Sequence, residues 1–319
     1  MELALVRDQI TDAVEGFQSS KLIVAAVRMN LFPTLEEVPS TSSSLAYRLG
    51  LSERGTLGLL EGLMQMGLVT RNGDGIYAVP AEVAMCLGRG GHLSQWVKHQ
   101  GTLYDLWEGL EQSARSGRPL LANTHDIDVP AYAWGLLEDY ASSSPKLHEV
   151  VDLSGEIRVL DAGGGTGHYL IYAALANPSL VGVIFDKPEV AKIAVEAIKS
   201  FGLDSLGVVA GDLLVDPWPG LFDVILLANI LHGKGEAGVR VLMDRAFGAL
   251  REKGRLIIVE WQQGSSLRSA LFNLTMLLCT EDGRVWPANS LEALAIITGF
   301  QKVEATMVNE DRYILVATK

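Results

Sequence analysis

The sequence VLDAGGGTGHY, residues 159–169, joins a short apolar run to a glycine-rich turn. The run ends at Asp161, and Gly163, Gly165 and Gly167 follow it in a G-x-G-x-G pattern. Glycine adopts backbone angles that other residues avoid and lets a ligand come close to the main chain. We therefore expect a strand that turns into a helix at a ligand-binding loop.

Two common nucleotide-binding patterns do not match this turn. A dinucleotide fingerprint, G-x-G-x-x-G, would require glycine at residue 168 or 169, where the chain has His168 and Tyr169. A phosphate-binding P-loop would require Gly-Lys followed by Ser or Thr, and none follows the turn. What remains is a turn preceded by an acid, Asp161, which suits a ligand with a charged amino-acid end.

From about residue 151 onward, short apolar, β-branched runs alternate with helical stretches. This rhythm predicts an α/β fold, with a Rossmann-like, doubly wound, mostly parallel sheet covered by helices on both faces. Two further runs around an Asn-Glu-Asp turn, residues 301–308 and 312–319, predict an antiparallel hairpin at one edge of the sheet. The runs of the parallel part are RVLDA (158–162), GVIFD (182–186), LGVVAGD (206–212), DVILLAN (223–229) and RLIIVE (255–260).

The second and third of these runs each end in an acidic residue. Asp186 lies 25 residues after Asp161, near the spacing at which an acid reaches ribose hydroxyls in such folds. Asp212 could accept a hydrogen bond from an adenine amino group, and Leu213 beside it could cover the ring. Together with the glycine turn, these acids indicate a nucleoside ligand with an amino-acid end.

The first 90 residues predict a mainly α, winged-helix-like domain. The segment KLIVAAVRMNLFPTL predicts an apolar helix that ends at Pro33, and two further helices end near Gly50 and Met66. Two short β-type runs then flank an Asn-Gly-Asp-Gly turn. Helix, turn, helix and β-wing is the order of a winged helix.

Charge argues against nucleic acid as a partner. The chain has a formal net charge of −12, and the helix from about Glu53 to Met66 carries one Arg and two Glu. We therefore expect this domain to mediate dimerisation, with a ligand-sensing winged-helix regulator as the less favoured alternative. The N-terminus lacks a secretory pattern, no apolar stretch is long enough to span a membrane, and the two cysteines have no disulfide or metal spacing. These features predict a cytoplasmic protein without a membrane partner or a metal.

The chain resembles the class I S-adenosylmethionine-dependent methyltransferases, and more closely the bacterial and plant small-molecule O-methyltransferases with an N-terminal winged-helix dimerisation domain. The resemblance implies a homodimer with interlocked N-terminal helices. It also implies that S-adenosylmethionine is bound with its methionine end over the glycine turn. The matching segments are AVRMNLF, SLAYRLGL, LLEGLMQMGLV, YAV, DAGGGTG, FDKP, GDLL, FDVILLANILH, LIIVE and LEALAIITGF, and the cofactor-binding residues would be Gly163, Gly165, Asp186, Asp212 and Leu213.

The segment FDVILLANILHGKGE places His232 just beyond the fourth run. A neutral imidazole can take the proton from a phenol or another activated hydroxyl. The resemblance implies that His232 is the general base and that Glu260 is one of two acids flanking it. It also implies that Met276 packs against the substrate ring. The expected reaction is transfer of a methyl group to a hydroxyl of a small, aromatic or polyketide-like molecule.

The neighbourhood of His232 departs from the family pattern. Gly233 and Lys234 replace an Asp and a Trp, Ala228 replaces a Lys that contacts the cofactor, and Val285 stands where the second acid is expected. A weakened acid–base cluster leaves open a non-methylating member of the same scaffold, with hydroxylase- or pericyclase-like chemistry. It is equally compatible with an unusually acidic substrate, or with methyl transfer driven mainly by proximity. Three segments are expected: a dimerisation domain (1–90), a helical connector lining the substrate cleft (91–150), and a catalytic domain that binds S-adenosylmethionine (151–319).

Overall fold

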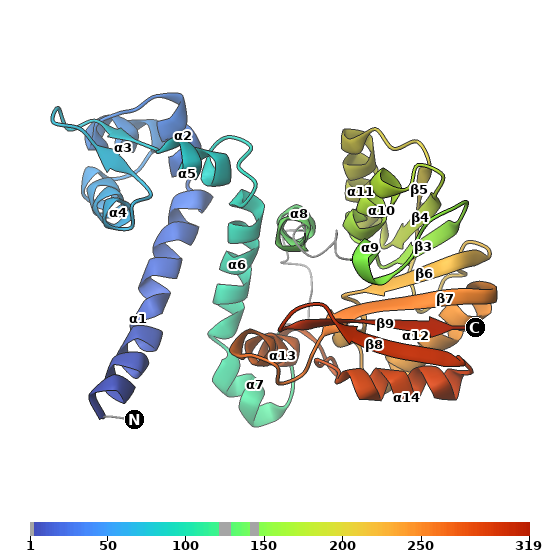
Figure 1. Cartoon of the computed structure of the whole chain (residues 1–319). Coiled ribbons are helices and arrows are strands. Elements are labelled where there is room, and N and C mark those ends of the chain that lie inside the picture. The colour runs from blue at the N-terminus through green and yellow to red at the C-terminus, as the bar shows by residue number, and fades with distance from the viewer. Residues whose placement is uncertain (1–2, 121–128, 141–146) are drawn as a thin grey trace. The chain divides into compact units, whose positions relative to one another are not determined.

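The structure is a computed structural model that describes residues 3–120, 129–140 and 147–319 (Figure 1). The chain forms two compact units, Met1–Tyr104 and Asp105–Lys319. The connector predicted for residues 91–150 falls on both sides of this division. No helix within the described residues is both long and apolar enough to cross a lipid bilayer.

The first unit has the predicted order of helices followed by a small two-stranded wing. The side chain of Thr41 caps the helix that begins at Ser42, by accepting a hydrogen bond from the backbone N–H of Ser44. The side chain of Ser52 caps the helix that begins at Glu53 in the same way, by accepting from the N–H of Gly55. In the turn between the strands, the side chain of Asn72 accepts hydrogen bonds from two backbone N–H groups. The elements are α1 (Leu3–Arg28), α2 (Leu31–Glu37), α3 (Ser42–Leu49), α4 (Glu53–Gln65), β1 (Thr70–Arg71), β2 (Tyr77–Ala78), α5 (Ala81–Leu87) and α6 (Ser94–Trp107), the last of which runs past the end of this unit.

The prediction that the first apolar helix ends at Pro33 is wrong. Helix α1 ends at Arg28, and Asn30 then adopts a left-handed conformation with φ of 56°. Pro33 lies in the first turn of α2, where the N–H group that proline lacks would have no partner within the helix. The break therefore comes from the left-handed asparagine, and proline helps to begin the next helix.

The second unit contains a seven-stranded sheet in the order β5-β4-β3-β6-β7-β9-β8 (Figure 1). Strands β3 to β7 are parallel, and β9 pairs antiparallel with both β7 and β8. The doubly wound sheet with an antiparallel edge hairpin is thereby confirmed. The strands are β3 (Arg158–Ala162), β4 (Val181–Asp186), β5 (Leu206–Ala210), β6 (Phe222–Ala228), β7 (Leu250–Trp261), β8 (Lys302–Met307) and β9 (Arg312–Thr318).

Two hydrophobic cores lie on opposite faces of this sheet, because successive side chains of a strand point to opposite faces. In β3, Val159 packs into the core with helices α10 and α11, whereas Leu160 packs into the core with α12 and α14. Both residues are fully buried. The helices of this unit are α7 (Leu110–Ser116), α8 (Val129–Tyr140), α9 (Leu147–Val150), α10 (His168–Ala176), α11 (Pro188–Phe201), the 3₁₀-helix η3 (Leu231–Gly233), α12 (Glu236–Ala249), α13 (Leu267–Cys279) and α14 (Ala288–Thr298).

The strand order reverses between β3 and β6. The chain leaves β3 toward β4 and β5 on one side, and later returns to add β6 on the other side. The loops that follow β3 and β6 therefore separate at the carboxyl end of the sheet. In open α/β sheets this switch point is where ligands bind.

Candidate active site

The glycine turn after β3 has the backbone that its sequence predicts. Gly163, Gly165 and Gly167 have φ angles of 76°, 61° and 79°, a region that strongly favours glycine. A Cβ atom at Gly163 would collide with the side chain of Ile230, which belongs to the loop after β6. The turn therefore lies directly against the loop after β6. At its glycines, the turn exposes backbone atoms where any other residue would place a side chain.

Asp186 braces the turn from the end of β4. Its carboxylate accepts one hydrogen bond from the backbone N–H of Gly165, at 2.8 Å, and one from the N–H of Lys187, at 2.7 Å. Burial raises the pKa of Asp186, and the two backbone hydrogen bonds act in the opposite direction. The side chain remains partly exposed, so it can also meet a ligand beside the turn.

Asp212 and Leu213 lie just after β5, as predicted. The carboxylate of Asp212 accepts a hydrogen bond from the backbone N–H of Leu214 at 2.7 Å, while its own N–H donates to Asp216 at 2.8 Å. These two hydrogen bonds hold residues 212–216 in a compact turn. Asp212 and Leu213 both keep partly exposed side chains.

A cavity of about 400 Å³ lies between the glycine turn, Asp186 and the loop that carries Asp212. It is lined by residues from the turn, from the ends of β4 and β6, from the loop after β5, and from α8. All five predicted cofactor-binding residues and His232 line it, whereas Glu260 and Met276 are not among the lining residues. The predicted residues that line it are Gly163, Gly165, Asp186, Asp212, Leu213 and His232.

Asp161 is a buried acid at the floor of this cavity. It is 1 % exposed, and neither of its carboxylate oxygens has a hydrogen-bond partner among the described residues. Burial, with a smaller contribution from the negative charge of Asp186, raises the pKa of Asp161 to about 7. A cationic group placed in the cavity beside Asp161 would favour its ionised form.

These residues fit S-adenosylmethionine. Asp161 offers a buried carboxylate to an ammonium group, and the bare backbone of the turn leaves room for the methionine chain. Asp186 lies at the strand end from which acids reach ribose hydroxyls. Asp212 and Leu213 offer an acceptor and an apolar surface to the adenine.

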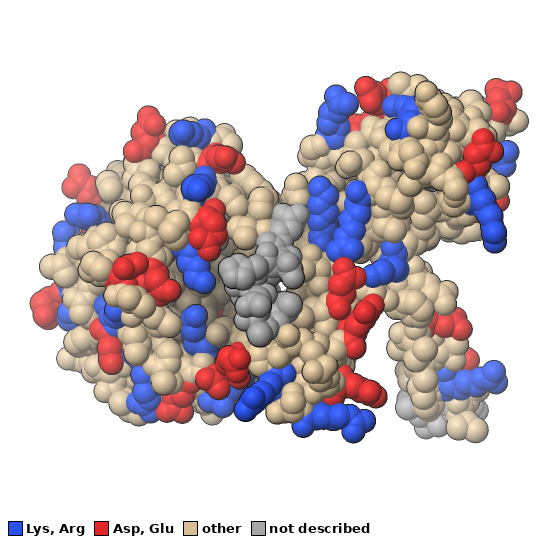
Figure 2. Space-filling view, turned by 180° about the vertical axis from the view of Figure 1, so that it is seen from behind, with Lys and Arg blue, Asp and Glu red and all other residues tan. Residues whose placement is uncertain are grey.

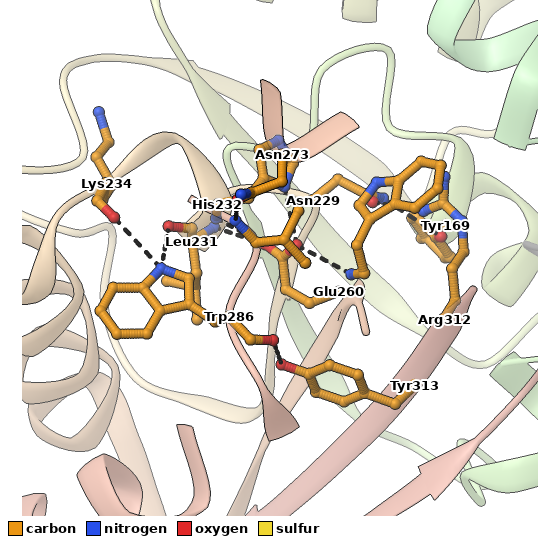
Figure 3. A network of polar contacts seen from close by, with 12 residues as sticks. Tyr169, Asn229, Leu231, His232, Lys234, Glu260, Asn273, Trp286, Arg312 and Tyr313 are labelled. Carbon is orange, nitrogen blue, oxygen red and sulfur yellow. Dashed lines mark hydrogen bonds and ion pairs between the residues drawn. The ribbon is translucent and has the colours of Figure 1, made fainter. Parts of the chain in front are cut away.

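His232 and Glu260 form a hydrogen-bonded pair beside the cavity (Figure 3). His232 lies in η3, and its Nδ1 is 2.8 Å from Oε2 of Glu260 at the end of β7. The other carboxylate oxygen accepts from the backbone N–H groups of Leu231 and His232, at 2.7 and 3.2 Å. Since Nδ1 donates to the carboxylate, Nε2 is the basic nitrogen of the imidazole.

Glu260 is a strong partner for this histidine because it is ionised although buried. Burial alone would raise its pKa, but the charge of His232 and the hydrogen bonds from His232 and Leu231 outweigh burial. The pKa of Glu260 consequently lies below its usual value. A carboxylate held in this state orients the imidazole and stabilises its protonated form.

The second acid expected from the family pattern is absent at Val285, as the sequence indicates. Val285 is fully buried, and its backbone N–H donates to the side chain of Asn273 at 2.8 Å. The neighbouring Trp286 supports η3 by another route. Its indole N–H lies 3.1 Å from the carbonyl oxygen of Leu231 and 3.3 Å from that of Lys234 (Figure 3).

Aromatic rings hold the histidine from the side of α13. Phe272 meets the His232 ring edge-on, with centroids 4.9 Å apart, and Trp261 stacks on Phe272 at 4.5 Å. Met276, predicted to contact the substrate, lies one helical turn beyond Phe272 and is 8 % exposed. Sequence reasoning missed Phe272, Trp261 and Trp286, because an aromatic residue in an apolar segment carries no signal of which site it adjoins.

Two family models match this chain. A family model described as the O-methyltransferase dimerisation domain matches residues 11–87, and one described as the O-methyltransferase domain matches residues 94–301.

Among curated proteins, the chain is similar to demethylspheroidene O-methyltransferase of Cereibacter sphaeroides, with 29 % identity over 93 % of this chain and 82 % of that protein. It is also similar to the tetracenomycin polyketide synthesis 8-O-methyl transferase TcmO of Streptomyces glaucescens, with 27 % identity over 92 % of this chain and 91 % of that protein.

The fold is shared with solved structures. Human N-acetylserotonin methyltransferase, solved in complex with S-adenosylmethionine, superposes with a TM-score of 0.85 at 22 % identity, over 100 % of this chain and 98 % of that one. The catalytic-domain model alone spans well over half of the sequence. The chain therefore belongs to the O-methyltransferase family.

Proposed function

We propose that this protein transfers the methyl group of S-adenosylmethionine to a hydroxyl group of a small, aromatic or polyketide-like molecule. The observation that carries the proposal is the His232–Glu260 pair at a cavity that the glycine turn also lines. S-adenosylmethionine, when bound, supplies an electrophilic methyl group. Gly163, Gly165, Asp186, Asp212 and Leu213 would hold it, with Asp161 at its ammonium group.

His232 acts as the general base. Its Nε2 takes the proton of the acceptor hydroxyl, and Glu260 stabilises the resulting imidazolium through Nδ1. The β6 loop that carries His232 packs against the glycine turn through Ile230. Acceptor and methyl donor are thus brought to one place, and this proximity can itself supply much of the rate enhancement.

The substrate class is supported by the residues around the base and by the names of relatives. Phe272 lies edge-on against His232 and stacks on Trp261, so the base has an aromatic neighbour. A relative from Streptomyces sahachiroi, 27 % identical over 85 % of this chain and 83 % of that protein, is named 3-hydroxy-5-methyl-1-naphthoate 3-O-methyltransferase. Val129, Tyr132 and Ala133 of α8 also line the cavity, which supports the role proposed for residues 91–150 in lining the substrate cleft.

The N-terminal segment, residues 1–90, would form a homodimer. The matching dimerisation model supports this, as does a group of exposed apolar side chains on α1, since such surfaces mark association sites. The members of this group are Leu3, Leu5, Ile10, Val14 and Phe17, which are 49–86 % exposed. The same match favours dimerisation over the ligand-sensing regulator as the role of this domain.

We propose a cytoplasmic location, and neither nucleic acid nor membrane as a partner. Acidic and basic side chains are interspersed over the face of the Asp105–Lys319 unit shown in Figure 2, so that face has no basic tract for a phosphate backbone. Cys86 and Cys279 are both free thiols, as expected in a reducing compartment.

A second candidate, a non-methylating enzyme on the same scaffold, is favoured by one observation. Val285 is buried and apolar where the resemblance leads us to expect an acid, and Gly233 has no side chain. Glu260 is the one carboxylate among the described residues that is hydrogen-bonded to His232. Product formed from the acceptor without release of S-adenosylhomocysteine would identify this chemistry.

Calorimetry with S-adenosylhomocysteine tests the cofactor assignment. We expect binding to the wild-type protein and at least about tenfold weaker binding to Asp186→Asn, since a hydrogen bond to a charged group contributes about 1.5–3 kcal/mol. Asp204→Asn, a change at an exposed acid in the same unit, is the matched control. No binding by the wild-type protein would exclude the assignment.

Release of S-adenosylhomocysteine with a panel of phenols, hydroxynaphthoates and polycyclic phenols tests the reaction. His232→Ala should slow turnover by about 10²–10⁴-fold without weakening S-adenosylhomocysteine binding, because general base catalysis contributes a factor of this size. If turnover stays near the wild-type rate, proximity replaces the general base in the mechanism.

A further inference from the structure

Arg312 is a buried cation close to the catalytic pair but outside it. It is the first residue of β9, it is 4 % exposed, and it pairs with Trp261 of β7 in the sheet. Its Nη1 donates a hydrogen bond to Oδ1 of Asn229 at 2.6 Å (Figure 3). Its guanidinium also lies over the indole of Trp261, 4.2 Å from the ring centroid.

The first of these contacts fixes the turn that leads to His232. Asn229 comes three residues before His232 and has a left-handed backbone with φ of 57°. Its N–H donates to the carbonyl oxygen of Val259 at 2.8 Å, which continues the pairing of β6 with β7. Asparagine is one of the few non-glycine residues that visit this region, and this turn takes support from the contacts around it. The hydrogen bond from Arg312 supplies part of that support.

The second contact reaches the imidazole itself. Trp261 stacks on Phe272 with an interplanar angle of 20°, and Phe272 meets His232 at 79°. The guanidinium, the indole, the phenyl ring and the imidazole thus form a continuous series of contacts. Glu260 holds Nδ1 of the imidazole by a hydrogen bond. Phe272 packs against the imidazole ring and limits its rotation about the Cβ–Cγ bond of His232.

We propose that Arg312 is a positioning residue, which holds the imidazole of His232 in its working orientation through Asn229 and through the Trp261–Phe272 stack. The inference rests on the proposed function, in which His232 is the base. Arginine suits the role because its planar guanidinium can lie flat on an indole while its edge donates to an amide oxygen. Lysine keeps the charge but cannot make both contacts with one planar group.

Arg312→Met and Arg312→Lys test the proposal, with Arg251→Met as the matched control. Arg251 lies at the other end of β7, where it pairs with Asp223 at 2.9 Å. Turnover is measured with the panel acceptor that the wild-type protein methylates fastest. Arg312→Met should lower kcat by about 10- to 100-fold, because a displacement of about 1 Å at a reacting group has effects of that size. KM and the Kd for S-adenosylhomocysteine should stay within about twofold, as expected for an effect on orientation.

A second readout does not depend on turnover. In protein labelled with ¹⁵N-histidine, the hydrogen-bonded Nδ1 proton of His232 is identified by its loss in His232→Gln. We expect this proton to exchange faster with water in Arg312→Met, at an intermediate rate in Arg312→Lys, and at the wild-type rate in Arg251→Met. The measurement reports the geometry of the pair even if no acceptor in the panel is methylated.

Two results would overturn the proposal. One is an Arg312→Met protein with wild-type kcat and an unchanged Nδ1 proton, which would show that Asn229 and Trp261 hold the turn without Arg312. The other is a loss of S-adenosylhomocysteine binding in proportion to the loss of kcat, which would assign Arg312 a general structural role. Failure of the wild-type protein to methylate any acceptor, with the expected change in proton exchange, would contradict the proposed function and leave the positioning role supported.

Discussion

Nδ1 of His232 lies 2.8 Å from Oε2 of Glu260, although the two residues are 28 positions apart in the sequence. Two neighbouring parallel strands bring them together, because β6 and β7 both end at the carboxyl edge of the sheet. Glu260 accepts three further hydrogen bonds from backbone N–H groups. The carboxylate therefore fixes the backbone of η3 and the imidazole ring together.

Glu260→Gln should reduce kcat by about 10²–10⁴-fold, the range that a general base contributes. The amide keeps an acceptor for the backbone of η3 but places an NH₂ group opposite Nδ1, which favours the wrong tautomer of the imidazole. S-adenosylhomocysteine binding, measured by calorimetry, should be unchanged. Glu304→Gln, at an exposed glutamate of β8, is the control. Full activity of Glu260→Gln would show that the tautomer of His232 does not limit the reaction.

Asp161 should make the stability of the protein depend on pH. Its pKa is about 7 in the folded protein and 3.8 as the ordinary value, so the folded state binds the extra proton between these pH values. The free energy of unfolding therefore falls as pH rises from about 4 to 7. Asp161→Asn removes this contribution, and its melting temperature should exceed that of the wild type by more at pH 8 than at pH 5. An equal difference at both pH values would mean that Asp161 is already ionised at pH 5.

The same carboxyl should make cofactor affinity depend on pH. The ammonium group of S-adenosylhomocysteine interacts best with ionised Asp161, so affinity should rise as pH increases from 6 to 8. In Asp161→Asn, affinity should be lower and should lose this rise. Calorimetric titrations at three pH values measure both effects, and Asp204→Asn should titrate like the wild-type protein.

Gly163→Ala should weaken cofactor binding much more than Gly202→Ala does. Both glycines have positive φ angles, 76° and 66°, so both substitutions introduce backbone strain of about 1–2 kcal/mol. At Gly163 the new Cβ would also collide with the side chain of Ile230. At Gly202 the new Cβ would have no other atom within 4 Å. The difference between the two variants in S-adenosylhomocysteine affinity measures the close approach of the turn to the β6 loop. Equal affinities would exclude that close approach as a requirement for binding.

Trp286→Phe should slow turnover while leaving the cofactor site intact. The indole N–H donates to the carbonyl oxygens of Leu231 and Lys234, which flank His232. Its loss should destabilise the protein by about 1–3 kcal/mol, the cost of leaving buried acceptors unsatisfied. Thermal unfolding, kcat and the Kd for S-adenosylhomocysteine are measured together. An unchanged kcat alongside a lower melting temperature would limit Trp286 to a role in stability.

Much of the cofactor region could be predicted from the sequence, because it depends on short-range patterns. The positive φ angles of Gly163 and Gly165 are of the kind that glycine favours, Asp186 ends a strand that an apolar run predicts, and Asp212 lies two residues beyond the end of the next strand. The prediction that the first apolar helix ends at Pro33 failed because the helix end did not follow from a short-range pattern. Asn30 ends the helix in a left-handed conformation that no local pattern required, and proline then suits the first turn of α2.

The fold class and the glycine turn could be predicted from the sequence, since both rest on local periodicity and on motifs a few residues long. His232 and Glu260 became candidates through the resemblance to the O-methyltransferase family. The residues that hold the base in place could be recognised only in the folded chain. Arg312 of β9, Phe272 of α13 and Trp286 before α14 contact the loop after β6, and Trp261 of β7 stacks on Phe272. Their contacts arise because the sheet places β7 and β9 beside that loop, and packing between distant segments leaves no periodic signal in the sequence.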